Sequence, residues 1–250
     1  MNALKAALIR ALLWLSSLLP LSWARSMGRG FAFLYWPIGD RSRKITERNI
    51  QLAFPELSLA QQQQLAKDSL AATAETMAEM GRVWMRPWEH FNELILSVAG
   101  PEQKSDAQKA GRGVIAMAPH LGNWEVIGLY TASWCNMVSL YEPPKLAAVG
   151  PIIEKARERS GATLVPTDSR GLATLLKSVK RGAVSGILPD QAPPELKAGQ
   201  NAPFMGVSCF TGTLSVNMIR RTGALAVFAY AKRVPGGFTL HYRLADEKIY

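Results

Sequence analysis

From residue 112 onward, short apolar runs alternate with longer segments of helical periodicity. The apolar runs are candidate strands, at residues 113–118, 137–141, 162–166, 183–188, 224–231 and 238–243. Helical stretches fill most of the intervals, at residues 124–134, 147–159, 169–181 and 212–222. Strands separated by helices pair in parallel, because the crossover between two parallel strands is long enough to hold a helix. The alternation therefore predicts an α/β fold, with a mixed, mostly parallel sheet flanked by helices.

The chain before this region begins with apolar segments. Residues 11–24 carry no charge, and residues 27–36 are again apolar and aromatic. The uncharged run is shorter than the ~20 residues of a membrane-spanning helix. Lys5 and Arg10 ahead of it also resemble the start of a signal peptide, but no clear cleavage site follows. We therefore expect residues 1–36 to be an uncleaved membrane-associated region, either a short spanning helix or an interfacial one. A pair of buried core helices is the alternative.

Two more helices are predicted before the sheet. Residues 40–54 have the pattern of an amphipathic basic helix. Ser58 and Gln61 have the spacing of a capping box, which opens a helix that runs to about residue 81. Farther along the chain, residues 191–203 are rich in Pro and Gly and predict a long loop. Such a loop is either a lid over a site or a surface excursion.

The loop after the first predicted strand carries the strongest candidate for a catalytic site. His120 lies on this loop, and Glu125 lies in the first turn of the next helix. Ligands bind at the carboxyl ends of strands in α/β sheets, and a histidine with a nearby carboxylate can act as a general base with its orienting partner. The spacing alone is weak, since His120 can also close a turn while Glu125 interacts with the helix dipole.

The residues around this pair favour the functional interpretation. Pro119 restrains the loop, and Gly122 allows the backbone to approach a ligand closely. Asn123 is a suitable N-cap for the following helix. The passage is thus built as a strand, a tight loop and a helix start.

The segment from His120 to Glu125 resembles the His-x-x-x-x-Asp/Glu signature of glycerolipid-type acyltransferases. Its Gly-Asn-Trp-Glu ending is similar to that of the lipid A biosynthesis acyltransferase family, the lauroyl- and myristoyl-type late acyltransferases of Gram-negative bacteria. Other segments resemble motifs of this family in the same order, at Arg48–Leu57, Arg157–Gly161, Leu188–Gln191 and Phe204–Gly206 with Thr211 and Gly212. The resemblance runs from about residue 40 to residue 230.

The resemblance implies an acyltransferase of lipopolysaccharide biosynthesis. It would move a fatty acyl chain from the thioester of acyl carrier protein to a hydroxyl of a phosphorylated lipid A precursor. His120 would be the general base and Glu125 would hold the imidazole tautomer, with direct attack on the thioester and no acyl-enzyme. The protein would lie at the inner membrane, with its catalytic domain on the cytoplasmic side. Transfer to glycerol phosphate or another membrane lipid, and a non-catalytic membrane-binding relative, are the alternatives.

The same motifs imply further substrate-binding residues: Asn123, Arg157, Arg159, Asp190, Phe204, Gly206 and Thr211. An arginine suits phosphate recognition or oxyanion stabilisation, although one of the two also suits the C-terminal end of a helix. Asp190 would follow a strand, where it either positions the substrate or an arginine, or caps a turn. The last three residues either line an acyl tunnel or form an ordinary turn and helix start.

The charge of the chain bears on its partners. The formal net charge is +10, and the basic residues are spread out rather than gathered in runs. No zinc knuckle, phosphate-binding glycine loop or RNA-binding pattern occurs, so that no nucleic acid, metal or nucleotide cofactor is expected. The charge suits a phosphorylated lipid, an anionic membrane and an acidic acyl carrier protein. Cys135 and Cys209 belong to no Cys-x-x-Cys motif and are expected to be free thiols.

The length of 250 residues accommodates one α/β domain with a helical N-terminal part. The resemblance implies an aromatic and basic C-terminal helix after the last predicted strand, whereas the chain ends at Tyr250. We therefore expect two parts. They are the membrane-associated region of residues 1–36 and an acyltransferase domain of residues 37–250 that is truncated at its C-terminus.

Overall fold

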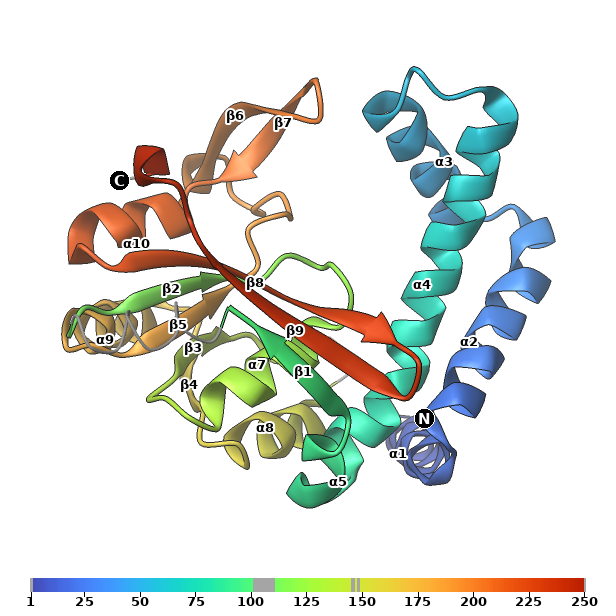
Figure 1. The fold of residues 1–250 in the computed structure, drawn as a ribbon, viewed down its shortest axis with the longest axis horizontal. Helices are drawn as coiled ribbons and strands as arrows, with labels where there is room; N and C mark the ends of the chain where they lie inside the picture. Colours follow the sequence, from blue (N-terminus) through green and yellow to red (C-terminus); the bar gives the residue numbers. More distant parts are fainter. Residues whose placement is uncertain (1, 101–110, 145–146, 148, 250) are drawn as a thin grey trace.

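The computed structural model describes residues 2–100, 111–144, 147 and 149–249 (Figure 1). The helices are α1 (Asn2–Leu18), α2 (Leu21–Tyr35), α3 (Arg41–Ala53), α4 (Leu59–Met85), α5 (Trp88–Asn92), α7 (Trp124–Ala132), α8 (Gly150–Glu158), α9 (Ser169–Lys180) and α10 (Leu214–Thr222). The strands are β1 (Ile95–Ala99), β2 (Val114–Met117), β3 (Val138–Tyr141), β4 (Thr163–Pro166), β5 (Val184–Ile187), β6 (Gly199–Phe204), β7 (Val207–Gly212), β8 (Leu225–Val234) and β9 (Gly237–Leu244). Short 3₁₀ turns occur at η1 (Trp36–Ile38), η2 (Leu196–Ala198) and η3 (Glu247–Ile249).

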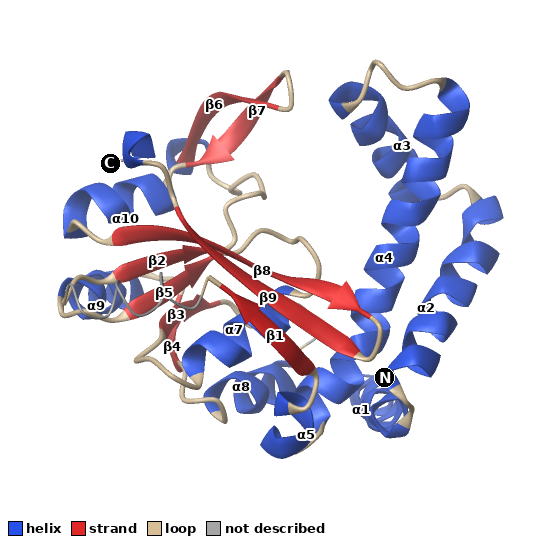
Figure 2. Cartoon of the chain, viewed as in Figure 1, coloured by secondary structure: helices blue, strands red, loops and turns tan. Residues whose placement is uncertain are grey.

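A five-stranded sheet forms the centre of the molecule, in the order β1-β9-β8-β2-β5 (Figure 2). β2 pairs in parallel with both β8 and β5, and β1 pairs in parallel with β9. β8 and β9 form an antiparallel hairpin. β3 and β4 form a separate parallel pair, which a bridge between Met137 and Val184 connects to β5. The prediction of a mixed, mostly parallel sheet flanked by helices is confirmed.

Both faces of β2 are covered, which explains its uninterrupted apolar sequence. Val114 and Ala116 point into a core that includes side chains of α7. Ile115 and Met117 point the other way, into a core formed with α9 and α10. Successive residues of a strand face opposite sides, so that a strand buried on both sides has no position for a polar residue. The loop after β2 therefore starts from a rigid, fully packed strand.

The N-terminal helices lie outside the sheet, where α2 runs beside α4 and α1 packs across the C-terminal part of α4 (Figure 1). The contact between α1 and α4 is close, because a Cβ atom on Gly81 would lie 2.6 Å from the carbonyl oxygen of Leu13. The opposite faces of α1 and α2 are open to solvent. They expose large apolar side chains, namely Leu4, Leu8, Leu12, Trp14, Leu15, Trp23, Met27, Phe31, Phe33 and Leu34. The alternative of two buried core helices is therefore wrong.

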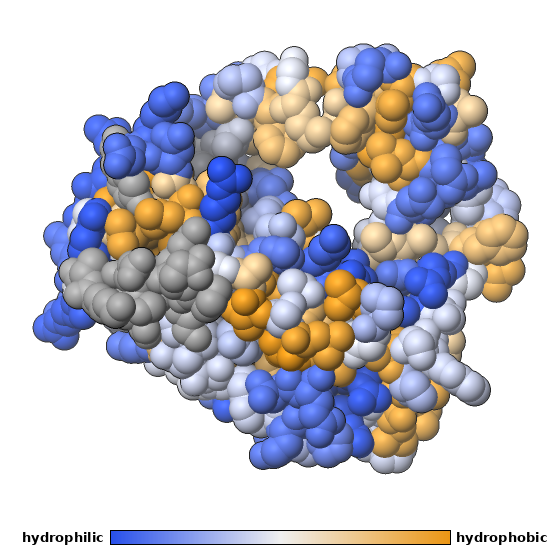
Figure 3. Space-filling view, viewed as in Figure 1, coloured by the Kyte–Doolittle hydropathy of each residue, from blue (hydrophilic) through white to orange (hydrophobic). Residues whose placement is uncertain are grey.

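The surface view shows some of these apolar side chains along the edge of the molecule that α2 occupies (Figure 3). Among the helices that the structure describes, none is both long enough and apolar enough to span a membrane.

The β6–β7 hairpin is the main departure from the predicted elements. It stands apart from the central sheet (Figure 1), and residues 199–203 of the predicted loop belong to its first strand. Its turn consists of Met205 and Gly206, which both have positive φ angles, of 48° and 78°. Such turns usually carry Asn-Gly, and Pro203 is unusual inside a strand. The sequence therefore lacks the ordinary signals of a hairpin. β1 also lies outside the predicted strands.

Candidate active site

The loop between β2 and α7 carries His120 and is held at both ends by backbone contacts. Ala118 N–H donates to Ile187 at the end of β5, and Asn123 N–H donates to Ala231 of β8, at 2.9 Å and 3.2 Å. Gly122 has a φ of 66°, and a Cβ atom there would lie 2.0 Å from the oxygen of Ala231. Only glycine fits this position. The loop thus lies at the carboxyl ends of three adjacent parallel strands, as the sequence predicts.

Asp190, three residues after β5, holds the imidazole of His120. Its Oδ1 lies 2.9 Å from Nδ1 of His120, and its Oδ2 accepts the backbone N–H of His120 at 2.8 Å. One carboxylate therefore fixes both the ring and the loop. A carboxylate on Nδ1 favours the tautomer with the proton on that atom, which leaves Nε2 as the basic nitrogen. The side-chain nitrogen of Gln191 lies 3.3 Å from Nε2. Each member of the pair keeps about a quarter of its side chain exposed.

Glu125 has different partners from those predicted. Arg157 of α8 binds it at two points, with Nη2 to Oε1 at 2.5 Å and Nε to Oε2 at 3.2 Å. The indole N–H of Trp84 donates to Oε2 at 3.1 Å. The prediction that Glu125 holds the tautomer of His120 is wrong in this structure. Its carboxylate is only 4% exposed, and a buried carboxylate is stable when an arginine neutralises it.

The pKa of Arg157 reflects this pairing. Burial acts to lower it, but the hydrogen bond and the charge of Glu125 outweigh burial and raise the pKa above its ordinary value. Arg157 therefore stays charged and remains committed to Glu125. A guanidinium engaged in this way is poorly placed to serve a developing oxyanion as well.

Two other predicted substrate-binding residues have structural partners. Arg159 donates to the carbonyl oxygens of Val83, at 2.5 Å, and of Arg86, at the C-terminal end of α4. Burial lowers its pKa. For one arginine of the pair, the alternative role was a cation at a helix C-terminus. Arg159 has this role, at the C-terminal end of α4 rather than of α8. Asn123 is fully buried and accepts Val126 N–H at 3.2 Å, so that it is the N-cap of α7. Both side chains thus make structural contacts here.

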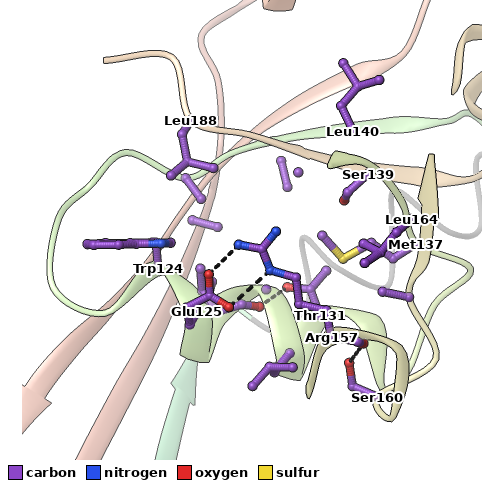
Figure 4. A pocket seen from close by; sticks show the side chains of 18 residues that line it. Trp124, Glu125, Thr131, Met137, Ser139, Leu140, Arg157, Ser160, Leu164 and Leu188 are labelled. Carbon is purple, nitrogen blue, oxygen red and sulfur yellow. Dashed lines mark hydrogen bonds and ion pairs between the residues drawn. The ribbon is translucent and has the colours of Figure 1, made fainter. Parts of the chain in front are cut away.

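A mainly apolar cavity, partly open to solvent, adjoins the loop (Figure 4). Figure 4 shows the Glu125–Arg157 pair in its wall, with Trp124 and Leu188 toward one end and Met137 toward the other. The ring of Trp124 packs edge-on against His120, with ring centres 4.7 Å apart. The basic histidine therefore lies beside the cavity rather than within it. Leu188 also lines a second, larger groove together with Gln191, so that the two neighbours of His120, Trp124 and Gln191, each line one of the two spaces.

Phe204, Gly206 and Thr211 lie on the β6–β7 hairpin. None of the three lines the cavity or the groove. Phe204 is 59% exposed, and the hydroxyl of Thr211 donates to the carbonyl of Cys209 at 3.1 Å. The expectation that they line an acyl tunnel finds no support here, because the hairpin projects away from the sheet. The alternative of an ordinary turn and helix start is not observed either, because Phe204 and Thr211 lie in the two strands of the hairpin and α10 begins only at Leu214.

Trp84 and Gln191 contribute to the site but are not among the predicted site residues. Gln191 follows Asp190 directly, and its place in the motif at Leu188–Gln191 is a signal for it. Trp84 lies near the end of α4, far from the motif in sequence, and nothing near it indicates a contact with Glu125. In the described part of the chain, no three residues among His, Cys, Asp and Glu come together in a way that would hold a metal ion.

Known proteins resemble this chain along most of its length. A model of the bacterial lipid A biosynthesis acyltransferase family matches residues 2–244. A lipid A biosynthesis palmitoleoyltransferase of Escherichia coli (strain K12) is 22% identical over 215 residues, which cover 86% of this chain and 69% of that protein. A lipid A biosynthesis lauroyltransferase of the same organism is 24% identical over 226 residues, 90% of this chain and 72% of that protein.

Proposed function

The chain belongs to the bacterial lipid A biosynthesis acyltransferase family and is an acyltransferase, and on this premise we propose the reaction that it catalyses. It transfers a fatty acyl chain from the thioester of acyl carrier protein to a hydroxyl of a phosphorylated lipid A precursor. The observation that carries this proposal is the His120–Asp190 pair beside an apolar cavity, to which Trp124 connects it. A base beside a space for a hydrocarbon chain is what acyl transfer to a hydroxyl needs.

In the proposed reaction, Nε2 of His120 takes the proton of the acceptor hydroxyl. The oxygen attacks the thioester carbonyl directly. When the tetrahedral intermediate collapses, the bond between carbon and sulfur breaks and the imidazolium returns the proton to the leaving thiolate. Asp190 accepts the hydrogen bond from Nδ1–H, stays ionised, and stabilises the imidazolium while it exists. No cofactor or metal enters these steps.

The oxyanion of the intermediate needs a partner of its own. Two candidates are Arg157, in the wall of the cavity, and the N-terminal end of α7, which follows the loop of His120. Because Arg157 is committed to Glu125, we assign the oxyanion to the first turn of α7, where the helix dipole favours negative charge. The Glu125–Arg157 pair then joins α7 to α8 and keeps the cavity open beside the base.

The acyl chain is proposed to occupy the cavity of Figure 4. Its lining is chiefly apolar and includes Leu129, Leu140 and Leu164. Each methylene that leaves water for such a lining contributes about 0.8 kcal/mol of binding free energy. The carbonyl end of the chain would lie near Trp124, where it comes close to His120.

The exposed apolar faces of α1 and α2 support association with the membrane that holds the lipid acceptor. We propose that residues 1–36 rest in the interface of the inner membrane, while residues 37–250 carry the acyltransferase site on the cytoplasmic side. The net charge of +10 fits an anionic bilayer, a phosphorylated acceptor and an acidic acyl carrier protein, rather than a nucleic acid.

The test is acyl transfer by the purified protein. Labelled acyl carrier protein and a phosphorylated lipid A precursor are supplied in vesicles, and the product is identified by mass spectrometry. We expect transfer by the parent protein and a loss of about 100-fold or more in His120→Ala. Transfer to glycerol phosphate in place of the lipid A precursor would replace the proposed acceptor. Near-parental turnover by His120→Ala would sink the assignment of the base.

A further inference from the structure

A buried charge cluster contacts the C-terminal half of the catalytic loop, at Gly122 and Asn123. Its centre is Glu79 of α4, which is fully buried. Oε1 of Glu79 accepts from Nε of Arg25, on α2, at 2.7 Å and from Nε of Arg233, on β8, at 3.0 Å. Arg25 also donates to the carbonyl oxygens of Val234 and Gly237, so that α2, α4 and the β8–β9 turn meet at this point (Figure 1).

Burying the charges of this cluster costs free energy, which indicates that the cluster has a role other than stability. A buried ion pair is often no more stable than apolar residues of similar volume, because both charges lose their hydration. What ionic groups do provide is a fixed geometry, since their hydrogen bonds tolerate little displacement. Arg25 and Glu79 keep 9% and 0% of their side chains exposed. The cluster is therefore a rigid point next to the catalytic loop, and the remaining oxygen of Glu79 can hold a group of that loop in place.

That oxygen, Oε2, accepts the side-chain N–H of Asn123 at 2.9 Å. Asn123 is the N-cap of α7, because its Oδ1 accepts Val126 N–H at 3.2 Å. The neighbouring carbonyl of Gly122 accepts from Thr76 and Arg233, each at 3.4 Å. The C-terminal half of the catalytic loop is thus attached to α4 and β8, while Asp190 attaches the half that carries His120.

We propose that Glu79 is a positioning residue for acyl transfer, which acts on His120 through Asn123. The inference rests on the proposed function, in which His120 is the base. Glu79 touches neither substrate nor His120. It fixes the start of α7 and, with it, the distance between the imidazole and the cavity that receives the acyl chain. A displacement of about 1 Å in such an arrangement can cost as much as 100-fold in rate.

Two substitutions break the same contact from its two sides. Glu79→Gln keeps the shape of the side chain and removes its charge. Asn123→Ser keeps a residue that caps helices well but removes the donor to Glu79. We expect each to lower kcat by about tenfold or more with KM within about twofold of the parent. The kcat of the double variant is expected to be no lower than that of the less active single variant, because both substitutions remove the same interaction.

Glu75→Gln is the matched control. Glu75 lies one turn before Glu79 on α4 and binds Arg29 and Arg233, at 2.6 Å and 3.7 Å, without touching the loop. Its loss removes a charge from the same helix and from the same arginine. We expect its kcat to stay within about twofold of the parent, whereas Glu79→Asp, which keeps the charge, recovers part of the activity.

A second readout does not depend on activity. The chain has three histidines, and the NMR signal of His120 in the histidine-labelled protein is identified by its loss in His120→Ala. We expect the ring signals of His120 to move in Glu79→Gln and in Asn123→Ser but not in Glu75→Gln. Signals that stay in place, or a folded Glu79→Gln with parental kcat, overturn the inference. So does a double variant whose two effects multiply.

These outcomes are separate from those of the proposed function. If His120→Ala keeps parental turnover, the proposed function fails, and the ring signals still decide whether Glu79 positions His120. If His120→Ala is inactive and neither Glu79→Gln nor Asn123→Ser lowers kcat, the inference alone fails. Should Glu79→Gln not fold, Asn123→Ser carries the test with the same two readouts and the same criteria.

Discussion

His120 and Glu125 lie five residues apart in one motif, yet their surroundings differ in kind. His120 and its partner Asp190 form a partly exposed pair at the end of two strands, next to two open spaces. Glu125 and Arg157 form a pair between two helices, with the carboxylate almost fully buried. The first pair keeps about a quarter of each side chain exposed, and Gln191 is the neighbour of its second ring nitrogen. In the second pair, two hydrogen bonds join the guanidinium to the carboxylate, and both residues form part of the cavity wall.

This difference shows how one short motif supplies two functions. A helix that begins at Trp124 sends Glu125 toward α8, while the loop before it leaves His120 at the strand edge. The histidine then needs an acid from elsewhere, and Asp190 comes from the end of the neighbouring strand β5. We therefore regard the His120–Asp190 pair as the chemical part of the site and the Glu125–Arg157 pair as its support.

The largest effect is expected at the chemical pair. Asp190→Asn removes the charge that stabilises the imidazolium and places an amide beside Nδ1 and the backbone N–H of His120. We predict that kcat falls about 100-fold or more, with KM little changed. Steady-state kinetics of acyl transfer measure this. A kcat within a few-fold of the parent would mean that Asp190 only closes the loop.

The supporting pair should respond in stability. Arg157→Ala leaves Glu125 buried with the indole of Trp84 as its remaining observed partner. We predict a loss of about 3–5 kcal/mol in the free energy of unfolding, because an uncompensated charge stays in the interior. Asp190→Asn should cost about 1 kcal/mol or less, since its pair is partly exposed. Urea unfolding of both variants compares the two regions, and equal losses would erase the distinction between them.

The cavity allows a test of how its wall determines the preferred length of the acyl chain. Gly128 lines the cavity, and a Cβ atom added there would meet nothing within 4 Å. Gly128→Leu should therefore fill space that the acyl chain uses, and shift the preference toward shorter chains by about tenfold in relative kcat/KM. Gly128→Ala is the control, because it strengthens α7 slightly and adds little volume. Competition between carriers with long and short chains gives the ratio, and an unchanged ratio would place the acyl chain elsewhere.

The apolar face of the N-terminal helices should matter for binding rather than for chemistry. Trp23 and Phe31 of α2 are both mostly exposed. Replacing both by Ser should weaken binding to anionic vesicles by about tenfold or more, since two aromatic side chains no longer leave water. Leu196→Ser, at an exposed position on η2, is the control. Sedimentation with vesicles measures the change, and equal binding by all three proteins would contradict the proposed interfacial face.

Salt should have the smallest effect. The screening length falls from about 10 Å at 0.1 M to about 3 Å at 1 M, so that steering of an acidic carrier weakens. We predict a drop of a few-fold in kcat/KM with an unchanged kcat. A fall in kcat of the same size would show that exposed charges take part in the chemical step.

Local patterns allowed much of the fold and part of the site to be predicted. The position of His120 follows from residues within a few places of it, and Asn123 caps α7 as expected. The capping box of Ser58 and Gln61 also opens α4, which continues to Met85. Each of these features depends on neighbours in sequence.

The partners of the site residues depend on the packing of distant elements. Asp190 lies 70 residues after His120 in the chain, and the two meet because β5 pairs with β2. Arg157 meets Glu125 because α8 packs on α7. A resemblance supplied the names of these residues, but the five-residue spacing led to the wrong partner for the histidine. Sequence spacing does not show which face of a helix start a side chain occupies.

The most direct test of this account is the state of the imidazole itself. Nitrogen NMR of histidine-labelled protein reports which ring nitrogen of His120 carries the proton. We predict a proton on Nδ1 in the parent and in Glu125→Gln, and a changed His120 signal in Asp190→Asn. A signal that changes in Glu125→Gln and stays the same in Asp190→Asn would show that Glu125 orients the base, and would contradict the division between the two pairs.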